Sequence, residues 1–149
     1  MARNTLITGA FALLLFVPQA WASESVQEQR HDLMETAKDA AKAIGGMLKG
    51  EQPFDAAVVM ESFATWENVA VKAGDLFPEG SETGFDTEAK ETIWTDREGF
   101  DVELETFSMA VTNAAMAAPQ NVEELKAAAG PVFDACKSCH EGYRVEDQN

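Results

Sequence analysis

Apolar residues recur every three or four positions along most of the chain, as they do on one face of an amphipathic helix. On a helical wheel with 100° per residue, the apolar residues between positions 25 and 49 fall within a narrow arc. One arginine falls within the same arc. Acidic residues and lysine occupy the opposite side. The positions on the arc are Val26, Arg30, Leu33, Ala37, Ile44 and Leu48. The pattern predicts one helix over 25–49, which ends near Gly50.

Three further helices follow from the same periodicity and from the prolines and glycines that interrupt it. The second is predicted to begin at Pro53, a residue suited to a first turn, and to stop before Phe77. The third is predicted over 88–117, where apolar residues alternate by fours and threes. The fourth is predicted from the cap residue Asn121 to about Arg144, with a kink at Gly130–Pro131.

No stretch alternates apolar and polar residues with a period of two, so no sheet is expected. Residues 78–87 have the composition of a loop long enough to cross one end of a bundle. Four helices joined in this way predict an all-α protein, an antiparallel four-helix bundle that forms one domain over residues 23–149.

The first 22 residues have the pattern of a cleaved secretory signal peptide. Arg3 supplies the basic start, residues 10–17 form an apolar run, and Ala20 and Ala22 supply the small residues before the cleavage site. A membrane anchor is the alternative, but a spanning helix needs about 20 apolar residues, roughly twice this run. We therefore expect residues 1–22 to be removed and the protein to be periplasmic, without a membrane anchor.

The formal net charge is −15. So acidic a protein is not expected to bind nucleic acid or anionic lipid, and long-range steering would favour cationic partners. The charge also keeps a protein soluble, so by itself it names no function.

Both cysteines and one of the two histidines fall within the five residues "CKSCH" at 136–140. Two extracellular cysteines can form a disulfide, and a redox-active pair can have this spacing, but such pairs sit in a βαβ context that this chain lacks. A zinc site needs four ligands. The other histidine, His31, lies roughly 120° from the centre of its helix's apolar arc and is predicted to face solvent.

Covalent haem attachment is a third use of these residues, and C-x-x-C-H is its sequence signal. Two thiols one helical turn apart can each add to a haem vinyl group, and a histidine at the next position can ligate the iron from the same helix face. Shuffling the composition gives this motif only about once in five thousand sequences, so it is specific. Apolar residues of the fourth helix fall within about 60° of Cys136, which predicts that the motif faces the bundle interior.

With this motif on its last helix, the sequence resembles the class II c-type cytochromes, and within them the cytochrome c prime family. The resemblance covers the chain after residue 22. It is carried by "RHDLM" at 30–34, "KGEQPFDAA" at 49–57, "IWTDREGF" at 93–100 and "CKSCHEGYR" at 136–144.

The resemblance implies one haem c, bound through Cys136 and Cys139, with His140 as the proximal iron ligand. Arg144 matches a basic residue near that histidine, although a cation near a helix C-terminus also needs no special role. Arg30 matches an arginine near the haem propionates, and a propionate would pair a charge that the periodicity places inward. Met34 matches the residue that covers the sixth position on iron; an ordinary core methionine is the alternative.

The implied function is a periplasmic haem protein that binds NO or CO at a five-coordinate iron, exchanges single electrons with redox partner proteins and is not an enzyme. If the Met34 thioether binds iron instead, the protein is a low-spin electron carrier. Family members are often homodimers through their first two helices. Val58 and Met47 are the apolar residues we expect to be exposed there.

Overall fold

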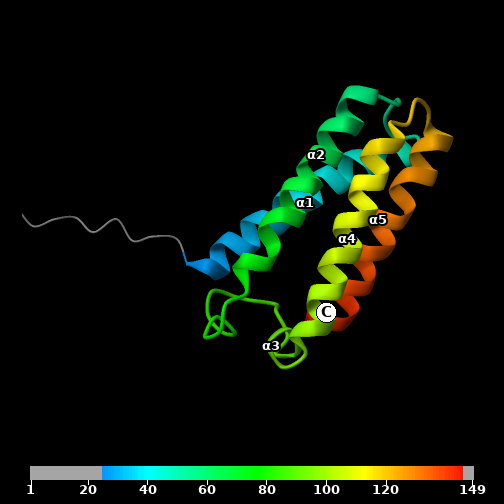
Figure 1. Ribbon diagram of the computed structural model, residues 1–149. Coiled ribbons are helices and arrows are strands. Elements are labelled where there is room, and N and C mark those ends of the chain that lie inside the picture. The colour runs from blue at the N-terminus through cyan, green and yellow to red at the C-terminus, as the bar shows by residue number, and fades with distance from the viewer. Residues whose placement is uncertain (1–24, 146–149) are drawn as a thin grey trace, which may run out of the picture.

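The computed structural model describes residues 25–145, so the predicted signal peptide and residues 146–149 lie outside it. Four long helices form the bundle (Figure 1): α1 (Val26–Leu48), α2 (Ala56–Ala73), α4 (Arg97–Ala117) and α5 (Val122–Tyr143). A 3-10 turn, η1 (Gly74–Leu76), and a one-turn helix, α3 (Thr92–Thr95), lie in the connection between α2 and α4. Within residues 25–145 there is no strand, and the predicted all-α four-helix bundle is confirmed.

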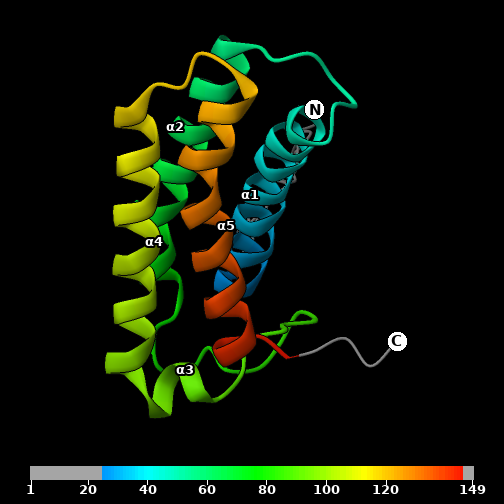
Figure 2. The ribbon, with the colours of Figure 1, turned by 90° about the vertical axis from the view of Figure 1, so that its right-hand side faces the viewer.

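The helices pack in a closed ring in which α1 contacts α2, α2 contacts α4, α4 contacts α5 and α5 contacts α1. The α1–α2 and α4–α5 connections lie at one end of the bundle, as Figure 2 shows. Segment 74–96 crosses the other end, where α1 begins and α5 ends. This end therefore brings the start of α1, the long connection and the CKSCH motif together.

Local hydrogen bonds fix where the helices begin. Ser25 and Glu28 form a reciprocal capping box at the start of α1. Asn121 caps α5 as predicted, because its side-chain oxygen accepts from the Glu124 amide at 2.9 Å. The predicted start of α2 at Pro53 is wrong. Asp55 caps this helix, and its carboxylate accepts from the amides of residues 57 and 58, so Pro53 precedes the helix.

The third predicted helix, 88–117, is wrong as one continuous element. Asp96, with φ −126° and ψ 57°, separates α3 from α4, and its side chain accepts from the Gly99 amide at 3.3 Å to cap α4. Residues 88–90 are extended because their backbone groups form hydrogen bonds with the end of α5. The Lys90 amide donates to the Tyr143 carbonyl at 2.9 Å, and the Val145 amide donates to the Glu88 carbonyl at 2.7 Å.

The core follows the predicted apolar arcs in large part. Arg30, Leu33 and Ile44 are buried in α1, and the helix α5 continues through Pro131. The expected exposure of Met47 is wrong, since only 2% of this residue is accessible and it packs in the main core. No helix within residues 25–145 is both long enough and apolar enough to cross a membrane.

Candidate functional site

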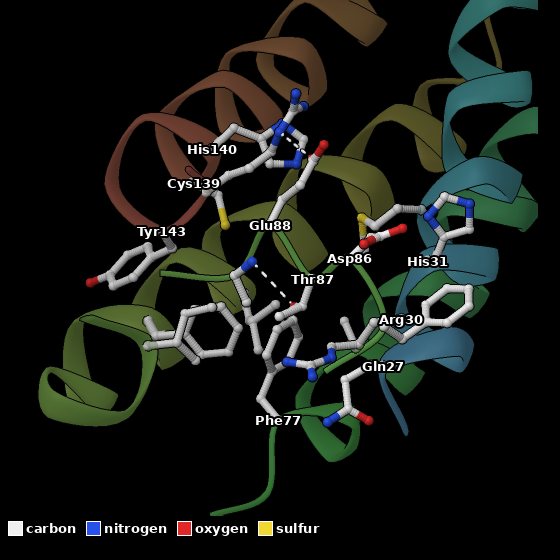
Figure 3. A pocket seen from close by; sticks show the side chains of 18 residues that line it. Gln27, Arg30, His31, Phe77, Asp86, Thr87, Glu88, Cys139, His140 and Tyr143 are labelled. Carbon is white, nitrogen blue, oxygen red and sulfur yellow. Dashed lines mark hydrogen bonds and ion pairs between the residues drawn. The ribbon is translucent and has the colours of Figure 1, made fainter. Parts of the chain in front are cut away.

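A pocket opens at the end of the bundle where α1 begins and α5 ends (Figure 3). One wall comes from the first turns of α1 and consists of Gln27, Arg30, His31 and Met34. The opposite wall comes from the last turns of α5 and consists of Cys139, His140, Tyr143 and Arg144. Between them lie apolar side chains, Ala73, Phe77, Ile93, Phe100 and Leu104, and the loop residues Phe85, Asp86, Thr87, Glu88 and Ala89.

The pocket gathers five of the six predicted site residues. Arg30 and Met34 face it from α1, and Cys139, His140 and Arg144 face it from α5 or just after it. The sixth, Cys136, does not line the pocket. It is half-buried against the main hydrophobic core, one turn before Cys139.

Burial raises the pKa of both cysteine thiols above the ordinary value. For Cys139 the pKa rises to about 11, first because the thiol is shielded from water and then because Glu103 and Cys136 lie near it. The pKa of Cys136 is raised by burial as well. A redox-active pair needs the opposite, a stabilised thiolate. The structure therefore gives no support to a thioredoxin-like use of these residues, and no disulfide joins them.

The environment of His140 favours a neutral imidazole. Burial lowers its pKa, the charge of Arg144 lowers it further, and Glu88 acts weakly in the opposite direction. Only a neutral imidazole has a lone pair to give to a metal. Within residues 25–145 no three His, Cys, Asp or Glu side chains gather as a zinc site would require. As an axial ligand to a haem iron, a single histidine is sufficient.

Arg30 is buried, with 6% of its surface accessible, and it has an incomplete set of partners. Its Nη2 donates to the Ser81 carbonyl at 2.6 Å, and its guanidinium lies over the ring of Phe77 at 4.8 Å and near that of Trp94 at 5.7 Å. Its Nε and Nη1 have no hydrogen-bond partner. Burial lowers the pKa of Arg30, although attraction to Glu82 opposes this effect.

Two unsatisfied donors on a buried cation are costly unless an anion reaches them. A haem propionate entering the pocket would supply that anion. The donor set also fits the rest of a haem: a neutral imidazole, thiols one helical turn apart and a largely apolar space between the walls.

Met34 lies on the wall of the pocket and is 38% exposed. It therefore does not belong to the hydrophobic core. This position is compatible with a side chain that covers an iron ligand site, and also with a methionine at the boundary of the core, so the role of Met34 stays a prediction.

Arg144 follows the last residue of α5 in an extended conformation. Its Nε lies 2.9 Å from Glu88 Oε2, and its backbone amide donates to the His140 carbonyl at 3.1 Å. The bridge between Ala89 and Arg144 and the neighbouring bonds tie residues 88–90 to the end of α5. Arg144 is thus placed beside His140 by the tertiary structure, in addition to any attraction to the helix dipole.

His31 is exposed, as predicted, but it also lines the pocket. Its ring meets that of Phe85 edge-on, with 6.0 Å between centroids. Sequence reasoning missed His31, Phe85 and Glu88 as pocket residues. For His31 the available signal was its place next to Arg30 on the helix, whereas the loop residues carry no periodic signal that could have placed them.

Tyr143 joins the pocket wall to the start of α4. Its hydroxyl donates to Asp96 Oδ2 at 2.9 Å, and burial together with this bond raises the pKa of the phenol to about 12. Gly99 makes the approach possible, because a Cβ atom there would overlap both the Asp96 carboxylate and the Tyr143 hydroxyl.

Replacing Gly99 with alanine is expected to lower the free energy of unfolding by about 1–2 kcal/mol, through loss of the Asp96 cap and of the bond to Tyr143. Urea unfolding measures this change. The matched control is Gly142→Ala in α5, where no atom beyond the neighbouring residues and the helix's own backbone lies within 4 Å of the added methyl group. The control is expected to stabilise the helix by about 0.5–1 kcal/mol. Equal effects of the two substitutions would contradict this account of Gly99.

The chain is similar to known proteins over most of its length. Residues 25–144 match the family model described as cytochrome c'. The chain is 39% identical over 127 residues to a cytochrome c' from Rhodopseudomonas palustris (strain ATCC BAA-98 / CGA009), with 85% of this chain and 86% of that protein covered. It is 30% identical over 151 residues to a cytochrome c-556 of the same strain, with 99% of each covered. The solved structure of a cytochrome c' from Rhodopseudomonas palustris superposes with a TM-score of 0.80 at 37% identity and covers 85% of this chain and 100% of that one.

Proposed function

This chain belongs to the cytochrome c' family, whose members carry one covalent haem c, and we propose that it is a periplasmic haem protein that binds NO or CO and exchanges single electrons. One observation carries the proposal. Cys139 and His140 face, across a single pocket, a buried arginine with two unsatisfied donors.

In this proposal each residue has a separate task. Cys136 and Cys139 form the thioether bonds that hold haem c on α5. His140 gives its neutral imidazole to the iron, and Arg144, fixed by Glu88, lies beside it. Arg30 donates its free Nε and Nη1 to a propionate. These assignments rest on the motif, the lining of the pocket and the hydrogen bonds described above.

When bound, the haem iron supplies one-electron exchange and a site for a diatomic ligand. The chain's contribution is an apolar surround opposite His140. Ala73, Leu104 and Met34 offer no hydrogen-bond donor, the donors of Arg30 are directed to Ser81 and, as proposed, to a propionate, and the exposed His31 packs against Phe85 at the outer edge of the pocket. Such surroundings favour NO and CO, which need no donor to hold them. They do not favour turnover of a peroxide, which needs polar groups to cleave the O–O bond.

A second function is favoured by two observations. Met34 faces the pocket, and a cytochrome c-556 is among the relatives that align over the whole chain. If the Met34 thioether binds iron, the site is closed to gases and the protein is purely an electron carrier. Histidine–methionine ligation would also raise the reduction potential.

The optical spectrum of the purified ferric protein distinguishes the two functions. We expect a high-spin spectrum that Met34→Ala leaves high-spin. A low-spin spectrum with a sulfur-to-iron charge-transfer band, converted to high-spin by Met34→Ala, would eliminate the five-coordinate site and support the electron carrier.

The periplasmic location rests on the predicted signal peptide, and the acidic surface supports a cationic redox partner. Self-association through α1 and α2 also stays a prediction. Met47 is buried and takes no part in such an interface, whereas Val58 lines a shallow groove between the two helices with small neighbours such as Ala40 and Ser62.

A further inference from the structure

The loop 81–88 forms the outer edge of the pocket and is anchored at both ends. At its start, Gln27 Nε2 donates to the Thr83 carbonyl at 2.8 Å and Arg30 Nη2 donates to the Ser81 carbonyl at 2.6 Å. At its end, the Glu88 carbonyl accepts from the Val145 amide at 2.7 Å. Between these anchors the backbone closes a turn through the Thr87 amide, which donates to the Gly84 carbonyl at 3.2 Å. The loop tip is therefore attached more lightly than its two ends.

The tip has an unfavourable backbone conformation. Gly84, Phe85 and Asp86 have φ values of 109°, 37° and 36°, so three consecutive residues lie in the left-handed region. Glycine accepts this conformation readily, but a bulky residue such as phenylalanine does so at a conformational cost. Backbone strain of this kind is often found at ligand clamps and switching segments.

The Phe85 side chain spans the gap between this tip and α1. It is 51% exposed, yet it lines the pocket, and its ring contacts the His31 ring edge-on at an interplanar angle of 75°. Figure 3 shows His31 and the neighbouring loop residue Asp86 on the same side of the pocket, away from Tyr143. The contact thus joins two walls of the pocket at a place where neither side chain belongs to the core.

We infer that Phe85 and His31 form a side gate, which sets how fast small ligands enter and leave the haem pocket. This inference rests on the proposed function and adds the residues that control access. The aromatic contact holds the loop tip against α1, and the strain at Phe85 opposes it, so the closed arrangement is favoured by no more than the strength of this one contact. Such loops control the rate of ligand exchange in many proteins.

A gate has a distinctive kinetic effect. It changes the barrier to entry and to exit equally, so the association and dissociation rates change by one factor and the affinity stays constant. A residue that contacts the bound ligand changes the affinity instead. From the usual strength of an aromatic pair, we expect loss of the contact to speed both rates by about twofold to tenfold.

The experiment measures CO association and dissociation with the ferrous holoprotein and its Phe85→Ala, Phe85→Gly and His31→Ala variants. Phe85→Gly fits the left-handed backbone, so it tests the side chain without relying on a strained alanine. All three variants are expected to bind and release CO faster at unchanged affinity. The increase should be larger for ethyl isocyanide, which is bulkier than CO. The matched control, Val102→Ala on α4, removes a side chain that is 56% exposed and does not line the pocket, and it should leave both rates unchanged.

A second measurement tests the contact itself. The His31→Ala/Phe85→Ala double variant should be no faster than Phe85→Ala alone, and its free energy of unfolding should be non-additive. Unchanged rates in all single variants, or a changed affinity at a constant association rate, would overturn the gate.

The same CO measurements are repeated with each variant combined with Met34→Ala. If the native iron is low-spin, the five-coordinate site fails as a proposal, but the gate is still tested in the Met34→Ala protein, where the thioether no longer competes.

Discussion

Replacing both Cys136 and Cys139 with alanine is expected to give protein from which acidified acetone removes all pigment. Thioether bonds survive denaturation, whereas a haem held only by packing and by His140 leaves once the bundle unfolds. Each single replacement leaves one thioether and should keep the pigment on the chain. Absorbance of the acetone phase and of the precipitated protein measures the difference.

Ser138→Ala is the matched control for the cysteine variants. Ser138 lies between the cysteines, and its hydroxyl donates to Glu103 at 2.9 Å on the exposed side of α5. The control should retain all pigment in the protein fraction. Pigment that stays bound in the double variant would show that the haem is attached elsewhere.

The replacement Arg30→Met is expected to lower the reduction potential of the holoprotein by roughly 50 mV and the free energy of unfolding by about 3 kcal/mol. Removing a cation near the haem stabilises the more positively charged ferric state, so the potential falls. The propionate also loses its partner in a buried place, and this loss destabilises the folded holoprotein. Potentiometric titration and urea unfolding measure the two effects.

Two controls separate charge from packing at this position. Arg30→Lys keeps the charge but loses the planar group over Phe77, so it should recover most of the potential and less of the stability. Arg97→Met removes an exposed arginine that pairs with Asp101 and does not line the pocket, so it should leave the potential nearly unchanged. If Arg30→Met and Arg97→Met shifted the potential equally, Arg30 would have no special relation to the haem.

The fold could be predicted from the sequence where the apolar periodicity and the capping residues indicate the same helix. The apolar arc of α1 and the Asn121 cap of α5 are local features, and the structure confirms both. The break at Asp96 was missed because the apolar spacing continues across it from Ile93 to Phe100. The Asp96 side chain caps α4 at that break, whereas the extended conformation of residues 88–90 depends on tertiary pairing with the end of α5, which periodicity does not register.

The site residues also fall into those that a local sequence signal predicts and those that only the tertiary structure places. The CKSCH motif and the inward Arg30 were predicted because each is a local signal, a spacing in one case and a charge on an apolar arc in the other. Glu88 and Phe85 were not predicted, since loop residues follow no periodic pattern that predicts where their side chains point. Cys136 faces the bundle interior as the helical wheel predicted, but the wheel could not tell that it packs against the core beside the pocket.

Peptide mapping of the purified holoprotein by mass spectrometry tests the central claim most directly, namely that one haem is bound covalently to the last helix through its two sulfurs. The account predicts that the proteolytic fragment containing residues 136–140 carries the added mass of one haem after denaturation. Recovery of that fragment at its unmodified mass, with both thiols free to react, would contradict it.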